Sequence, residues 1–411
     1  MSGSVNISKN RCGLRSKEIT FIRFKYIWEK PMNRSEISEL RKLYKPEKTA
    51  ISAIAGCYVD GEKNKKAVFK EALLPLPEED VFKYLEVYKK ALSGSIGKNI
   101  ANIEFPIEAE DEGSTHELMM RLRDSALSDE EALAVLYDKI IDAFEYTGNY
   151  LILLCCAAYD VPGKASDGMT MDDASETVYK YIQILICPVE LAKAALRYDE
   201  ESGSFSNRMR DWILSMPEFG LLFPAFNDRA ADIHGMLLYT RDPKNYREEM
   251  MQKVFGCKVP DPAYQQKNSF ASALETAIGD ELGLEAVKEL NDSLIRMKEE
   301  MAFNKAPVEV DAADFKYLLA DTGISDEKRE SFTGIYGEMT KESPILLDNI
   351  VSKKTMEIKT ASVSIKVDAE RSHLISERLI DGKKCLVVDI DGEAVEVNGV
   401  VISQTADISE G

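Results

Sequence analysis

The residues best suited to chemistry lie in one polar stretch that interrupts strongly apolar sequence. His234 is one of three histidines in the chain, and Asp228 and Asp232 come shortly before it. A carboxylate that orients an imidazole makes a group able to move protons near neutral pH. The pattern therefore supports an enzyme hypothesis in which His234, Asp228 and Asp232 are the catalytic residues.

Three further side chains near this stretch are suited to holding an anion, such as a small or phosphorylated substrate. They are the guanidinium groups of Arg210 and Arg229 and the amide of Asn227, and guanidinium groups bind phosphate and carboxylate in a forked geometry. The alternative is that the whole group ties a β-turn together, with the His234 imidazole bonded to a backbone carbonyl. We favour this structural alternative, because no Ser or Cys in a recognisable nucleophile motif lies nearby.

Other motifs that could bind phosphate or a metal ion are also better explained as structural features. The glycines at 94–99 lack the spacing and the Ser/Thr of a phosphate-binding loop, and the acidic run at 167–173 lacks the spacing of a calcium loop. Three lysines at 58–66 lie at the tip of a predicted hairpin, which either contacts phosphates or is simply a solvated turn. No C-x-x-C pair is present and the histidines are scattered, so we predict neither a metal site nor a cofactor.

Charge and cysteine usage narrow the class of protein. The net charge of -19 argues against a broad electrostatic hold on nucleic acid or anionic lipid, although a local basic face stays open. No apolar run approaches the length of a membrane span, so we predict no membrane association. Seven cysteines without a secretory signal indicate the reducing cytoplasm. We expect the basic residues 1–31 to be an extension outside the fold, and residues 404–411 to be a tail.

The elements that position these residues predict an α+β fold. Two paired strands at 219–226 and 233–240 carry the polar stretch between them. An unbroken apolar run at 149–159 predicts a strand buried on both faces, and 178–188 is predicted as another strand. The predicted order of domains is a mixed α/β domain at 32–257, a helical region at 258–342 and a small β-rich module at 343–403.

Several local boundaries follow from capping and turn signals. We expect a helix that starts at the capping box of Asn33 and Glu36, a hairpin that turns at Asp60, and a helix capped by Ser128 and Glu131. Further expectations are a loop at 162–173, a helix from Pro243 through Phe255, and a helix within residues 207–240.

Some segments form a pattern that covers most of the chain. They are GCYVDGEKN (56–64), LSGSIGKN (92–99), NYLILL with YDVPGK (149–164), ICPV (186–189), and NRMRDW with LLFPAFNDRAADIH (207–234). Together they resemble the bacterial domain-of-unknown-function family 4317 over nearly all of residues 32–401. The family has no known activity, so the resemblance implies membership and no chemistry.

A second and more distant resemblance concerns the C-terminal segments E-I-K, V-S-I-K-V-D and I-D-G. These are similar to the end of the bacterial nucleoid-associated protein family, whose acidic members associate with nucleoid DNA. The resemblance implies a partner class and assigns no site residue.

Three functions stay open, and we place a non-enzymatic one first. It is a bacterial cytoplasmic protein that binds a macromolecular partner, either nucleoid DNA or a protein. One alternative is an enzyme that acts on a small or phosphorylated substrate through the cluster around His234. Another is an oligomeric scaffold in which copies of the chain bind one another through the helical middle. Whether the protein is an enzyme is therefore open, with the balance against it.

Overall fold

The chain forms two compact units that divide between Ala263 and Tyr264. Residues 1–30 of the predicted extension, the predicted tail at 404–411 and residues 167–169 of the acidic run lie outside the described residues. The boundaries predicted at residues 258 and 343 stay predictions. The computed structural model describes residues 31–164, 170–301, 307–351, 355–390 and 394–402, with side chains described except at 164, 170–176 and 402.

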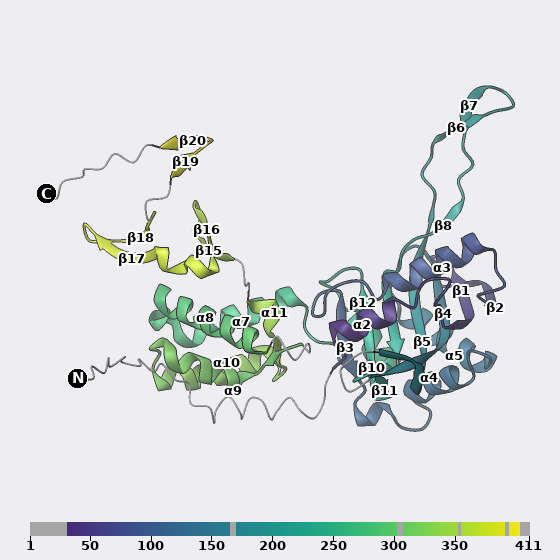
Figure 1. The fold of residues 1–411 in the computed structure, drawn as a ribbon, viewed down its shortest axis with the longest axis horizontal. Helices are drawn as coiled ribbons and strands as arrows, with labels where there is room; N and C mark the ends of the chain where they lie inside the picture. Colours follow the sequence, from purple (N-terminus) through teal and green to yellow (C-terminus); the bar gives the residue numbers. More distant parts are fainter. Residues whose placement is uncertain (1–30, 165–169, 302–306, 352–354, 391–393, 403–411) are drawn as a thin grey trace, which may run out of the picture. The chain divides into compact units, whose positions relative to one another are not determined.

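The first unit is built on an eight-stranded antiparallel sheet (Figure 1). Its strands lie in the order β2 (Lys65–Ala72), β1 (Ile51–Val59), β4 (Asn149–Lys164), β5 (Thr170–Leu191), β9 (Phe219–Phe223), β12 (Gly235–Thr240) and β3 (Ile100–Glu104), and β8 (Trp212–Leu214) pairs with the end of β5. The predicted hairpin at Asp60 is confirmed by the pairing of β1 with β2. The predicted pairing of the strands that flank the polar stretch is confirmed by β9 and β12.

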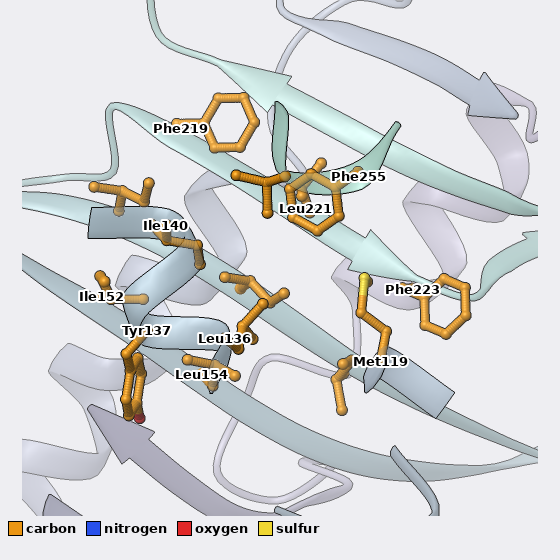
Figure 2. Packing of buried hydrophobic residues seen from close by; sticks show 14 of the residues in the cluster. Met119, Leu136, Tyr137, Ile140, Ile152, Leu154, Phe219, Leu221, Phe223 and Phe255 are labelled. Atoms are coloured by element: carbon orange, nitrogen blue, oxygen red, sulfur yellow. The ribbon is translucent and has the colours of Figure 1, made fainter. Parts of the chain in front are cut away.

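Helices cover both faces of this sheet. They are α2 (Arg34–Arg41) and α3 (Glu78–Lys90) on one face, and α4 (Thr115–Asp124), α5 (Glu130–Ala143), α6 (Glu248–Met250) and η2 (Met251–Phe255) on the other. Side chains alternate along β4. Leu153 and Cys155 join the apolar cluster that packs against α2 and α3, and Leu154 and Cys156 join the cluster that packs against α4 and α5. Figure 2 shows the cluster against α4 and α5, where Leu154 packs among side chains of α5 and β9. The predicted α+β class is confirmed, as is the strand buried on both faces.

Capping residues explain where the helices begin. Asn33 and Glu36 form the predicted capping box at the start of α2. The predicted cap at Ser128 is wrong by one residue, because the Asp129 side chain accepts the Ala132 N–H at 2.9 Å. The Ser128 N–H instead donates to the Ser125 carbonyl and closes the turn after α4.

Two further expectations are corrected. The loop predicted at 162–173 is partly strand, because β4 and β5 stay paired as far as Lys164 and Thr170 through register shifts at Pro162. The helix predicted from Pro243 begins only at Glu248. Arg247 before it has a left-handed φ of 57°, and this backbone geometry separates the turn at 242–246 from the helix.

The helix predicted within residues 207–240 is wrong, because the first part of this stretch belongs to a projecting β ribbon. The ribbon consists of β6 (Leu196–Asp199) and β7 (Ser204–Asn207), which pair only with each other. We call residues 192–211 the arm. Its two-stranded end lies beyond β8, away from the sheet (Figure 1).

The second unit combines a helical core with three β-hairpins. Its helices α7 (Ala263–Ile278), α8 (Leu284–Glu300), α9 (Ala312–Leu318) and α10 (Asp326–Thr340) confirm the helices predicted there. The aromatic side chains of Phe270, Phe315, Phe332 and Tyr336 pack together between α7, α9 and α10. The hairpins pair β15 (Thr355–Lys359) with β16 (Ser364–Asp368), β17 (Ile375–Ile380) with β18 (Lys383–Val388), and β19 (Val395–Val397) with β20 (Val400–Ile402).

Candidate functional site

The predicted catalytic stretch forms a tight hairpin, which we call the polar turn (residues 227–234). Within it, β10 (Ala225–Asn227) pairs with β11 (Ala230–Asp232). The two residues between the strands, Asp228 and Arg229, have left-handed φ values of 50° and 63°. Two consecutive left-handed residues are the geometry of the two-residue hairpin turn that follows the twist of its strands.

Arg229 is held by a carboxylate of its own chain. Its guanidinium Nη2 lies 2.9 Å from Glu39 Oε1 on α2, and its side chain is 13% exposed. The Tyr159 hydroxyl donates to the same Glu39 oxygen at 2.9 Å. Burial and this bond to Glu39 raise the pKa of Tyr159 to about 12. The structure therefore uses the predicted anion-holding arginine to join the polar turn to α2 and β4.

Asp228 and Arg229 also bind α2 through their backbone. The buried Glu36 carboxylate accepts N–H groups of Asn33, Asp228 and Arg229. Burial raises the pKa of Glu36, and the three backbone donors oppose that rise. Two carboxylates of α2, those of Glu36 and Glu39, thus fix the tip of the polar turn.

His234 faces a different carboxylate from those predicted. Its Nδ1 lies 2.8 and 2.9 Å from the two carboxylate oxygens of Glu110, and its side chain is 66% exposed. The hydrogen bond to Glu110 raises the pKa of His234. Sequence reasoning missed Glu110 because it precedes His234 by 124 positions and carries no local motif.

Asp232 and Asn227 stabilise the turn. Asp232 Oδ1 accepts the His234 N–H at 3.0 Å, and its other oxygen accepts the Asn227 amide at 2.7 Å. Both oxygens of Asp232 therefore hold the hairpin, while the His234 ring is left to Glu110. The turn can position an exposed, protonatable imidazole.

Arg210 is not part of the polar turn. It lies at the base of the arm, where its Nε donates to the Ala192 carbonyl at 2.6 Å. The Ala192 N–H donates to the Asp211 carbonyl at 2.8 Å, so this pair of contacts closes the base of the arm.

The lysine-rich turn and the glycine-rich loop both have structural partners. Lys63, Lys65 and Lys66 pair with the carboxylates of Glu145, Asp138 and Asp60. In the loop at 94–99, the Asn99 amide donates to the Thr240 carbonyl at 3.0 Å.

The arm presents an apolar surface that sequence reasoning did not find. In its register Tyr198 is opposite Phe205 and Leu196 is opposite Asn207, which places these four side chains on one face of the ribbon. The Tyr198 and Phe205 rings are 5.3 Å apart. The large apolar side chains exposed along the arm and β8 include Leu196 (71%), Tyr198 (53%), Phe205 (69%), Met209 (86%) and Trp212 (59%).

A sequence signal for this ribbon does exist. The segments L-R-Y-D and S-F-S-N alternate apolar and polar residues on either side of a turn that contains Gly203. Alternation around a glycine-containing turn is typical of a hairpin. The segments are only four residues long, however, and we predicted a helix for the neighbouring segment N-R-M-R-D.

Within the described ranges, no three His, Cys, Asp or Glu side chains come together in a way that could hold a metal ion. None of the helices described is both long and apolar enough to cross a membrane. Six cysteines in the same residues are free thiols, and five of them are buried.

Comparison with known proteins gives a family and no activity. The family model described as "Domain of unknown function (DUF4317)" matches residues 32–400. No curated protein matches the chain. The more distant resemblance to the nucleoid-associated family is not supported.

Proposed function

We propose that this chain, which belongs to the DUF4317 family, is a non-enzymatic protein whose arm binds a macromolecular partner. The observation that carries the proposal is the apolar face of β6 and β7, with Leu196, Tyr198 and Phe205 all more than half exposed. The cysteine usage of the sequence supports a cytoplasmic location for this protein.

The physical argument begins with the stability of the ribbon itself. An isolated two-stranded hairpin is marginally stable in water, because it buries little apolar surface. The ring pair of Tyr198 and Phe205 stabilises the ribbon and leaves most of its apolar face in water. Contiguous exposed apolar surface with a polar rim is typical of a protein-binding site. A partner seated on this face would stabilise both the ribbon and the complex.

The charges of the arm favour a protein partner over nucleic acid. The acidic residues Asp199, Glu200 and Glu201 lie at its tip, where a ribbon would enter a nucleic-acid groove. The net charge of -19 opposes the approach of a polyanion. Direct binding to nucleoid DNA is therefore the less favoured outcome of the test below.

The test is affinity purification of the tagged full-length chain from the cell that encodes it, with and without nuclease. The test variant is the double substitution Tyr198→Ser and Phe205→Ser. The matched control is Ile107→Ser, because Ile107 is 84% exposed and lies outside the arm. We expect a stoichiometric protein partner, or a second copy of the chain, that the control retains and the arm variant loses. Equal recovery of every bound molecule with the arm variant would refute the proposal, and nuclease-sensitive recovery would identify nucleic acid.

A second candidate function is favoured by the His234–Glu110 pair. An exposed imidazole held 2.8 Å from a carboxylate can transfer protons to a small substrate. A panel of phosphorylated small molecules incubated with the wild type, His234→Gln and Glu110→Gln would test this. Turnover that both substitutions abolish without changing the fold would favour the enzyme, and no turnover with any member would count against it.

A further inference from the structure

We infer that residues 41–48, which we call the basic segment, form a second binding surface that holds a short acidic segment of a partner protein. This surface is separate from the arm and goes beyond the proposed function. The inference is carried by four exposed cations that lie on one fixed stretch of backbone in a strongly acidic chain.

The basic segment reverses the charge balance of the chain. It reads R-K-L-Y-K-P-E-K, whereas the whole chain has 52 Lys and Arg against 71 Asp and Glu. Its four basic side chains are exposed, and none of them forms an ion pair with any residue that the structure describes: Arg41, Lys42, Lys45 and Lys48. The three lysines at the β1–β2 turn, in contrast, all pair with carboxylates. The segment therefore presents positive charge that its own fold does not neutralise.

The stability of α2 explains only two of these cations. Arg41 lies in the last turn of α2 and Lys42 caps it, and the helix dipole favours cations at that end. Lys45 and Lys48 lie beyond the helix, in a turn that the Lys48 N–H closes by donating to the Lys45 carbonyl at 3.0 Å. These two lysines have no such stabilising role in the helix.

The backbone of the basic segment is fixed by contacts within the first unit. Tyr44 in its middle is 3% exposed, and its hydroxyl donates to the buried amide of Gln183 at 2.8 Å. The Leu43 N–H donates to the Leu40 carbonyl at 2.9 Å, and the Lys45 N–H donates to the Leu43 carbonyl at 2.9 Å. Because the backbone is already ordered, a ligand that binds here restricts only the cationic side chains.

The charges around the basic segment favour a short ligand with several carboxylates. At physiological salt the field of an exposed charge fades over about 8 Å. A short peptide seated on the segment is therefore screened from much of the net charge of -19. A nucleic-acid duplex or a membrane covers a wider surface. On the same face of the sheet it would meet the exposed carboxylates at the start of α3, those of Glu78, Glu79 and Asp80.

The test measures the binding of a labelled oligoglutamate peptide to the full-length chain by fluorescence anisotropy. The test variant is Lys45→Glu with Lys48→Glu. The matched control is Lys139→Glu with Lys267→Glu, because these lysines are exposed on α5 and α7 and the change in net charge is the same. A third variant, Lys45→Arg with Lys48→Arg, keeps both charges in place. Circular dichroism and melting temperature establish that each variant is folded.

We expect the wild type, the control and the arginine variant to bind the peptide, and the test variant to bind it about tenfold more weakly or worse, since like charges then face each other. The affinity is expected to fall as salt is added, because the contacts are exposed ion pairs. No binding by the wild type, or an equal loss in the test variant and the control, would overturn the inference. Tighter binding of a DNA duplex than of the peptide at physiological salt would overturn the choice of an acidic peptide.

The outcome is separable from that of the proposed function. The double variant Tyr198→Ser and Phe205→Ser changes the arm alone, and we expect it to bind the peptide as the wild type does. Loss of peptide binding in this arm variant would contradict a separate surface at the basic segment. Retained peptide binding, together with unchanged recovery of partners in the affinity purification, would refute the role of the arm and leave the basic segment as a binding surface.

Discussion

Arg229 at the tip of the polar turn and Glu39 on α2 form a half-buried ion pair, with 2.9 Å between Nη2 and Oε1. The pair joins two elements that are 190 residues apart in the chain. It gives a structural role to the arginine that the enzyme hypothesis assigned to anion binding.

Removal of this arginine is expected to destabilise the first unit. Arg229→Ala leaves Glu39 partly buried beside Tyr159 without its cation, which costs about 1–3 kcal/mol of unfolding free energy. Urea denaturation measures the change. The control is Lys83→Ala, which removes the far more exposed pair with Glu86 and is expected to change nothing measurable. Equal effects of the two substitutions would contradict a structural role for Arg229.

The His234–Glu110 pair predicts a pH dependence with a definite sign. The pKa of His234 is raised above 6.5 by Glu110, so the pair stabilises the fold fully below the ordinary pKa and the contribution is lost as pH rises through the raised value. Glu110→Gln is expected to lower the pKa of His234 toward 6.5, as measured by NMR titration of the ring protons. The control is Glu112→Gln, which removes one nearby negative charge. A pKa of His234 that both substitutions lower equally would show that Glu110 has no specific effect.

The buried polar network in the α2–α3 layer gives a further prediction. Gln183 is 1% exposed, accepts the Tyr44 hydroxyl at 2.8 Å and donates to the Tyr88 carbonyl at 3.1 Å. Gln183→Leu removes both bonds and leaves the buried Tyr44 hydroxyl without the acceptor of its proton, at a cost of about 2–3 kcal/mol. Tyr44→Phe also removes two bonds of the network, the one to Gln183 and the one that the Tyr181 hydroxyl donates, and is expected to cost a similar amount in thermal denaturation. Unchanged stability for either substitution would contradict this assignment.

The sequence predicts the sheet well where its signals are local. The apolar run of β4 and the capping box at Asn33 each determine their element within a few residues, and both predictions are confirmed. The cap of α5 is less well determined by the sequence, because Ser128 and Asp129 are adjacent and both side chains can accept a helix N–H; the structure uses Asp129.

The candidate site could be predicted only in part. Asn227, Asp232 and His234 do lie together in one turn, as their spacing suggested. Their partners come from distant segments, since Glu110 and Glu39 approach only once the sheet and α2 have formed. Contacts between residues so far apart in the chain cannot be predicted from the local pattern of a single sequence. The arm was missed for a different reason, because four-residue strands give a weak periodic signal beside a charged stretch.

Affinity purification of the tagged full-length chain, from the cell that encodes it, tests the central claim most directly. It compares the wild type, the Tyr198→Ser and Phe205→Ser double variant, and the control Ile107→Ser. The account predicts a stoichiometric partner that the wild type and the control retain and the arm variant loses, because the exposed apolar face of β6 and β7 is the binding surface. A partner that the arm variant recovers as well as the wild type does would contradict it.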